Sequence, residues 1–261
     1  MKKVLNIFVW VVLLSAVILL PAFSSKERSQ MPCSGQEFSV GAGDDVVLIT
    51  ADDLDAYITS HFDTLKGRPA TTIDPQAVEL WLGENPYVHS AEAHLDLSYT
   101  LHIEVTQEQP LFRIFRPTGS SCYLSKSGRI IPLRDGIPVR VPVLSGFLGE
   151  VPLSGQHINE ERNPRLMAAH RLGLLLTHDS FLRLLVSQVY IESNGDIRME
   201  PRIARHSILL GDTTSIENKL EKLVAFYKQG LIRGPWDRYE LINLKYKDQV
   251  VCTKRKSYEI I

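Results

Sequence analysis

A long apolar run close to the start of the chain constrains the fold more than any other feature. Residues 4–23, VLNIFVWVVLLSAVILLPAF, come directly after the cations Lys2 and Lys3. About 20 apolar residues form a helix long enough to cross a bilayer, and flanking cations stay on the cytoplasmic side. We therefore expect a cytoplasmic stub over residues 1–3, a single transmembrane helix over residues 4–23, and an extracytoplasmic remainder of the chain.

A cleaved signal peptide is the alternative interpretation of the same run. Ala22, Phe23 and Ser24 form an acceptable small-x-small cleavage site. However, the run is longer than the roughly 7–15 apolar residues of a signal sequence, and Trp10 stands in its middle. Both features favour an anchor that is retained.

Charge and cysteine content are those of an ordinary globular protein. The 261 residues include 29 basic and 30 acidic side chains, so the net charge of −1 does not indicate a nucleic-acid partner. Cys33, Cys122 and Cys252 are far apart and odd in number, so they cannot all pair within the chain. Buried free thiols are the favoured interpretation.

The first segment after the run, residues 36–115, has the pattern of a small mixed module. Residues 24–35 before it are polar and contain Pro and Gly, which indicates a linker. The module has the predicted order β-α-α-β-β, with an additional short strand expected at residues 46–50. In its last strand the apolar residues alternate with polar ones, which predicts one buried face and one exposed face.

The two helices of this module are marked by their first residues. Thr50 and Asp53 have the spacing of a capping pair in front of a helix over residues 51–62. Asp74 followed by Pro75 is the usual opening of a second helix.

The second segment, residues 116–256, is richer in strands. Ser127-Gly128 and Asn194-Gly195 indicate hairpin turns, and Ser215 is expected to cap the last helix. Two alternating strands, YELINLKY and QVVCTKRK, close the segment and leave a tail over residues 257–261. The expected fold class is therefore α+β, with a mixed β-rich domain and flanking helices after the first module.

No catalytic or metal-binding motif stands out in the sequence. The patterns H-E-x-x-H, G-x-S-x-G and the P-loop are absent, so we expect neither an enzyme nor a cofactor. His89, His94 and His102 lie in a stretch rich in titratable groups. His89 and His94 are five residues apart, which puts them on opposite faces of a regular strand, and we expect solvent-facing histidines instead of a zinc site.

The final strand offers a different type of site. No following sequence is seen that would cover its outer edge, and an uncovered edge can accept a strand from a partner. In contrast, Lys254, Arg255 and Lys256 are charges of the kind that block such pairing. The residues alone leave both alternatives open.

Several stretches of the chain resemble the bacterial FtsQ/DivIB cell-division family, particularly its Bacteroidetes-like members. ENPYVHSAEAHLDLSYTLHIEVTQEQPLFRIF is similar to the end of the family's POTRA module, CYLSKSGRIIPL and VPVLSG to the opening of its β domain, and YELINLKYKDQVVCTKR to its terminal hairpin. The likeness covers nearly the whole chain. Three positions depart from it: Ser125 and Asn243 replace an Asp, and Lys245 replaces an Arg.

The resemblance implies a non-enzymatic scaffold of the division complex, or divisome. Residues 36–115 would be a POTRA-like domain and residues 116–256 an FtsQ-type β domain, held in the periplasm by a single-pass anchor in the cell inner membrane and enriched at the division septum. FtsQ-like proteins bind the small coiled-coil membrane proteins FtsB and FtsL and help control septal peptidoglycan synthesis.

The resemblance also implies which residues bind partners, because the last strand of the family's β domain accepts a strand from FtsB. On this chain the docking edge would be residues 249–256, supported by the preceding strand. The expected contact residues are Tyr239, Leu241, Leu244, Tyr246, Gln249, Val250, Val251, Cys252, Lys254 and Arg255. A second edge in the POTRA-like domain would comprise Val88, His89, Ser90, Glu92 and His94.

A POTRA-containing component of envelope assembly or secretion is the alternative function. Such a component would be expected to repeat the POTRA module, and the sequence contains no repeat of useful period. The cell-division interpretation is therefore favoured.

Fusion of alkaline phosphatase after Ile261 should give an active enzyme, because alkaline phosphatase forms its disulfides only outside the cytoplasm. Activity is measured in permeabilised cells. The same fusion to a chain without residues 1–23 is the control and should be inactive. An inactive fusion to the complete chain would contradict the predicted topology.

Overall fold

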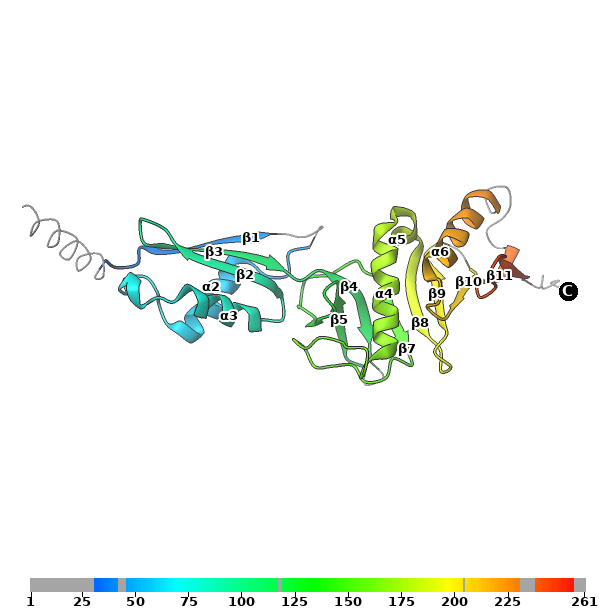
Figure 1. Cartoon of the computed structure of the whole chain (residues 1–261), viewed down its shortest axis with the longest axis horizontal. Coiled ribbons are helices and arrows are strands. Elements are labelled where there is room, and N and C mark those ends of the chain that lie inside the picture. Colours follow the sequence, from blue (N-terminus) through cyan, green and yellow to red (C-terminus); the bar gives the residue numbers. More distant parts are fainter. Residues whose placement is uncertain (1–30, 42–45, 117–118, 204, 231–237, 256–261) are drawn as a thin grey trace, which may run out of the picture. The chain divides into compact units, whose positions relative to one another are not determined.

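The computed structural model describes residues 31–41, 46–116, 119–203, 205–230 and 238–255, which fall into two compact units (Figure 1). The predicted transmembrane helix, with Lys2 and Lys3, lies outside the described residues. None of the helices that are described is both long and apolar enough to cross a bilayer.

The first unit is a three-stranded sheet with two α-helices packed on one face (Figure 1). The strand order is β1-β3-β2, with β1 parallel and β2 antiparallel to the central strand. The elements are β1 (Gly35–Gly41), α2 (Ala51–Phe62), the 3-10 helix η1 (Ala70–Thr72), α3 (Pro75–Glu84), β2 (Val88–Leu95) and β3 (Thr100–Gln107). This is the predicted order β-α-α-β-β.

The helix starts of the first unit are the predicted ones. The Asp53 amide donates to the Thr50 hydroxyl at 3.3 Å, and the Thr50 amide donates to the Asp53 carboxylate at 2.8 Å, which completes a capping box. Asp74 accepts from the Gln76 amide at 3.1 Å. The prediction of a strand at residues 46–50 is wrong, because this stretch has no strand pairing. It instead buries the side chains of Leu48 and Ile49.

The second unit is built on a nine-stranded mixed sheet with the order β12-β11-β10-β9-β8-β7-β4-β5-β6. Its strands are β4 (Pro110–Phe115), β5 (Ser121–Ser125), β6 (Ile130–Pro132), β7 (Val143–Gly146), β8 (Val186–Ile191), β9 (Ile197–Pro201), β10 (Ser207–Gly211), β11 (Tyr239–Asn243) and β12 (Val251–Lys254). Its helices are α4 (Pro164–His178), α5 (Ser180–Leu185), α6 (Ile216–Ala225) and the π-helix η2 (Phe226–Gly230).

The boundary between the units differs from the predicted one. Residues 110–115 were expected to close the first module, but they form β4 of the nine-stranded sheet, and the units divide between Gln107 and Glu108. β4 pairs with β5 and, in parallel, with β7, where Ile114 lies opposite Leu144. Alternation of apolar residues predicts a strand at 110–115 but contains no information on which distant strand it pairs with.

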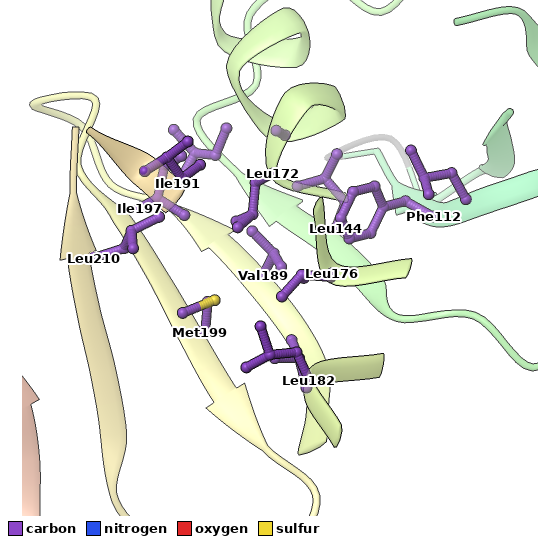
Figure 2. Close-up of a cluster of buried hydrophobic side chains, with 14 of the residues drawn as sticks. Phe112, Leu144, Leu172, Leu176, Leu182, Val189, Ile191, Ile197, Met199 and Leu210 are labelled. Carbon is purple, nitrogen blue, oxygen red and sulfur yellow. The ribbon is translucent and has the colours of Figure 1, made fainter. Parts of the chain in front are cut away.

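The helices of the second unit bury one face of the nine-stranded sheet. A row of paired residues crosses the sheet on this face, from Ile114 through Leu144, Val189 and Met199 to Ile208. Leu172 and Leu176 of α4 and Leu182 of α5 pack onto the same cluster (Figure 2), together with Ile216, Leu220 and Leu223 of α6. Full burial of one such side chain contributes about 1.5–3 kcal/mol.

The start of α6 departs from the prediction. Ser215 has a positive φ of 50° and its side chain makes no capping hydrogen bond. Asp212 instead holds this end of the helix, because Lys219 donates to its carboxylate at 2.7 Å and to its carbonyl at 2.8 Å. The hydrogen bond from Lys219 is also the main reason that the pKa of Asp212 is lowered.

A buried carboxylate supports the hairpin between β5 and β6. Both oxygens of Glu108, which is 3% exposed, accept from the Ser127 hydroxyl at 2.8 and 2.9 Å. Ser127 also lies 2.9 Å from the Ser125 hydroxyl, which accepts from the Arg129 amide at 3.0 Å. Glu108 therefore supplies a buried carboxylate to this hairpin from outside its two strands.

Gly173 of α4 should be intolerant of a methyl group. A Cβ at this position would lie 2.3 Å from Cε2 of Phe112 in β4. We expect Gly173→Ala to destabilise the second unit by about 1–2 kcal/mol, because overpacking outweighs the gain of about 1 kcal/mol in helix propensity. Urea unfolding measures the change. Gly83→Ala in α3 is the matched control, since nothing lies within 4 Å of its Cβ, and it should be neutral or stabilising.

Candidate partner-binding edge

The last strand, β12, lies at the edge of the nine-stranded sheet. Among the described strands it pairs with β11 alone, antiparallel, with Val251 opposite Asn243 and Cys252 opposite Ile242. The prediction that the final strand forms a sheet edge is therefore confirmed in its geometry. The strand is shorter than expected, because Gln249 and Val250 precede it and residue 256 lies outside the described residues.

The outward-facing backbone groups of β12 follow from its hydrogen bonds to β11. The Arg255 amide donates to the Arg238 carbonyl at 3.0 Å, so Arg255 faces β11. Because the direction alternates along an antiparallel strand, Thr253 and Val251 also face β11, and the N–H and C=O groups of Cys252 and Lys254 face outward. Over the described ranges no hydrogen bond is made to these outward groups.

The opposite edge of the same sheet is covered. The Ile130 amide of β6 donates to the Gln156 carbonyl at 2.8 Å, and the Ile130 carbonyl accepts from the Gly155 amide at 2.8 Å. The loop beside β6 thus occupies the outward N–H and C=O groups of Ile130. Covering an edge strand in this way is one of the means by which natural sheets avoid unwanted pairing. β12 has no such cover among the residues that the structure describes, which makes it the open edge of the sheet.

The side chains of β12 divide between two faces. Val251, at 38% exposure, and Thr253 are exposed, whereas Cys252 is half-buried against the helix-covered core. Lys254 and Arg255 are exposed at the end of the strand. Thr253 was not among the predicted contact residues. Its place between Cys252 and Lys254 in an alternating strand was the signal that could have predicted its exposure.

The predicted residues on β11 and in the following loop have different roles. Leu244 is fully buried, and its amide donates to the Leu209 carbonyl at 2.9 Å, so it anchors the loop and offers no surface. Tyr239 and Leu241 are half-buried, and the Tyr239 ring lies 6.0 Å from that of Phe226. Tyr246, in contrast, is 49% exposed.

Two lysines, one in α6 and one in the loop itself, hold the loop between β11 and β12. Lys222 of α6 donates to the carbonyls of Tyr246 and Lys247 at 2.6 and 2.9 Å. Lys245 donates to the Asp196 carboxylate at 2.7 Å, and this hydrogen bond raises the pKa of Lys245. The edge strand is therefore presented by a fixed hairpin, which lowers the entropy that a partner strand must overcome.

The second predicted edge, in the first unit, is partly blocked. β2 is an edge strand, but the Ala93 amide donates to the Glu79 carboxylate of α3 at 2.7 Å. Val88 is fully buried, so its predicted contact role is wrong, and a β-bulge interrupts the strand between Val88 and Ser90. The other predicted residues are exposed: His89, Ser90, Glu92 and His94.

A histidine pair that the sequence analysis missed lies on the same sheet. His94 is paired directly with His102 on β3, and the rings stack with centroids 5.4 Å apart. His102 also lies 3.1 Å from the Asp96 carboxylate and 3.5 Å from that of Glu37. Separation along one strand could not reveal a pair formed across two. In the described part of the chain, no group of three or more His, Cys, Asp or Glu residues has metal-binding geometry.

Hydrogen bonds within the β2–β3 turn explain its electrostatics. The Asp96 carboxylate accepts from the Ser98 hydroxyl at 2.7 Å and from the Thr100 amide at 2.8 Å. These bonds stabilise the ionised form and hold the pKa of Asp96 well below its usual range. The polar residues of this stretch thus order the turn.

The sheet with the open edge matches a known protein family. Residues 109–253, more than half of the chain, match the family model described as FtsQ/DivIB, C-terminal related. The chain belongs to the FtsQ/DivIB family. The part of the chain that matches begins in front of β4 and ends inside β12, so it contains both the nine-stranded sheet and nearly all of its open edge strand.

Curated relatives agree with this FtsQ/DivIB assignment. The Cell division protein FtsQ of Salinibacter ruber is 26% identical over 196 residues, which cover 73% of each chain. The protein of the same name from Rhodothermus marinus is 26% identical over 184 residues, which cover 69% of this chain and 65% of the relative. The family resemblance inferred from the sequence is thus confirmed.

Cys252 of this FtsQ/DivIB chain should be the reactive thiol. Cys33 and Cys122 are only 2% and 3% exposed, whereas Cys252 is half-buried. We expect iodoacetamide to label Cys252 first, at a rate that still rises at pH values above the usual pKa of a free thiol, because burial raises the pKa of Cys252 and the thiolate is the reacting form. Mass spectrometry of proteolytic fragments measures the labelling. Equal labelling of Cys33 or Cys122 in the folded chain would contradict the structure.

Proposed function

We propose that this chain is a non-enzymatic scaffold of bacterial cell division, anchored in the inner membrane, that binds FtsB- and FtsL-like proteins in the periplasm and helps control septal peptidoglycan synthesis. Membership of the FtsQ/DivIB family and the names of the two relatives support a role in division. The apolar run at residues 4–23 supports the anchor and the topology.

The uncovered edge of β12 is the observation that carries the proposed binding mode. A partner strand beside β12 would meet the outward-facing backbone groups of Cys252 and Lys254. Each hydrogen bond formed this way contributes a net 0.5–1.5 kcal/mol, roughly, and pockets for alternate side chains give such pairing its specificity. The exposed side chains of Val251 and Thr253 would then contact the partner.

Charge blocking of this edge is the competing interpretation. The Arg255 guanidinium is turned to the Arg205 carbonyl at 2.5 Å, and Lys256 lies outside the described residues. Lys254 is thus the exposed cation of β12 itself. One flexible cation at the end of a strand is a weak barrier compared with the loop that covers β6, which favours docking.

A POTRA-like role of the first unit is part of the proposal. Its β-α-α-β-β order supports this assignment, and its β2 edge would serve further partners through His89, Ser90, Glu92 and His94. The family match covers residues 109–253 and so favours division over an envelope assembly or secretion role.

Lys254→Pro should abolish docking without unfolding the sheet. Proline removes one outward N–H group of β12, and an edge strand tolerates proline where the N–H faces solvent. We expect FtsB- and FtsL-like proteins of the same cell to co-purify with the wild-type chain and to be lost with Lys254→Pro. Lys254→Ala is the matched control, because it removes the charge and keeps the N–H group.

Depletion of the chain in its native host extends the same test to function. Filamentous or unseparated cells should result, rescued by the wild type and by Lys254→Ala but not by Lys254→Pro. Normal septation after depletion would overturn the role in division. Rescue and co-purification by Lys254→Pro would overturn the docking mode alone.

A further inference from the structure

A groove on the helical face of the second unit remains outside the proposed docking edge. Its volume is about 440 Å³, and it lies between the α4–α5 corner and the α6–η2 segment. The lining residues are Leu175, Asp179, Leu182, Glu217, Leu220, Glu221, Val224, Ala225, Lys228 and Gln229. None of these residues belongs to β11, β12 or the loop between them.

The groove has an apolar floor. Leu182 and Leu220, at 2% and 5% exposure, belong to the buried core and form its base. Leu175 and Val224 are half-buried and pack against the same core from the two sides. An apolar side chain that entered the groove would extend this core, whereas in the free protein water contacts Leu175 and Val224.

The rim of the groove carries negative charge beside α6. Glu217 and Glu221 are four residues apart on α6, so they lie on one side of the helix, where like charges repel. The lysines of α6 do not offset them, since Lys219 is bound to Asp212 and Lys222 to the loop after β11. Within the described residues neither glutamate has an ion-pair partner.

A third carboxylate lies on the opposite wall. One oxygen of Asp179 accepts from the amides of Phe181 and Leu182, at 2.8 and 3.0 Å, as the cap of α5. Lys228 is the cation that lines the groove, and it lies beyond Glu217 and Glu221 along the chain. The groove is therefore acidic beside α6 and basic beside η2.

We propose that this groove binds a partner helix that is amphipathic and cationic. Its apolar side chains would contact Leu175, Leu182 and Val224, and its Lys or Arg residues would pair with Glu217 and Glu221. Helices commonly dock in this manner, through apolar anchors at i, i+3 and i+7 in a groove between two helices. The site is a second docking surface, distinct from strand addition at β12, and it does not depend on the proposed function.

The test uses the full chain in neutral-lipid nanodiscs and a fluorescent helical peptide of about four turns. The peptide is built from Leu at helical anchor spacing with Lys beside the anchors, and a second peptide carries Glu in place of Lys. Fluorescence anisotropy, corrected for empty nanodiscs, should detect binding of the Lys peptide. Glu217→Gln with Glu221→Gln should weaken it about fivefold, and added salt should weaken it further.

Ala225→Trp fills the groove from an exposed position of α6, so it should abolish binding without unfolding the chain. Glu161→Gln, at an exposed glutamate that does not line the groove, is the matched control and should leave affinity unchanged. Equal binding of the two peptides, or binding unaffected by Ala225→Trp at an unchanged unfolding midpoint, would overturn the proposal. Loss of binding with Lys254→Pro instead would assign the peptide to β12 and also overturn it.

Discussion

Burial of a single face of the nine-stranded sheet is the constraint on which the second unit depends. The apolar row from Ile114 to Ile208 runs across strands that are distant in sequence, and it must be covered to be kept from water. α4, α5 and α6 provide the cover. The close approach of α4 to β4 at Gly173 and the groove between α5 and α6 are both consequences of fitting three helices to one twisted face.

The strand edges of this chain are protected to different degrees, and this difference directs attention to β12. Loop backbone covers β6, and Glu79 occupies an amide of β2. β12 remains uncovered in the described part of the chain, although its hairpin is held firmly by Lys222 and Lys245. A strand that is held on one side and open on the other is suited to recognition, because little order has to be created when a partner binds.

Local chemistry made much of the fold predictable from the sequence. The capping box at Thr50, the start of α3 at Asp74 and the hairpin at Asn194-Gly195 are each encoded within a few residues. The order of the elements in the first unit followed from such signals. They carry no information on pairing between distant strands, which is why β4 was assigned to the wrong unit.

The same limit applies to the candidate site. Alternation predicted that β12 would expose side chains, but the burial of Leu244 and Val88 depends on tertiary packing that no short window contains. The stacked pair of His94 and His102 depends on the register between two strands. The groove beside α6 brings together side chains from helices about 40 residues apart, so only the folded chain reveals it.

The acid that supports the β5–β6 hairpin limits what position 125 can hold. The buried carboxylate comes from Glu108, and Ser125 joins the same network through the Ser127 hydroxyl. Two ionised acids in one buried network would raise each other's pKa and cost stability. An acid at position 125 is therefore compatible with this hairpin only where the side chain at position 108 is neutral.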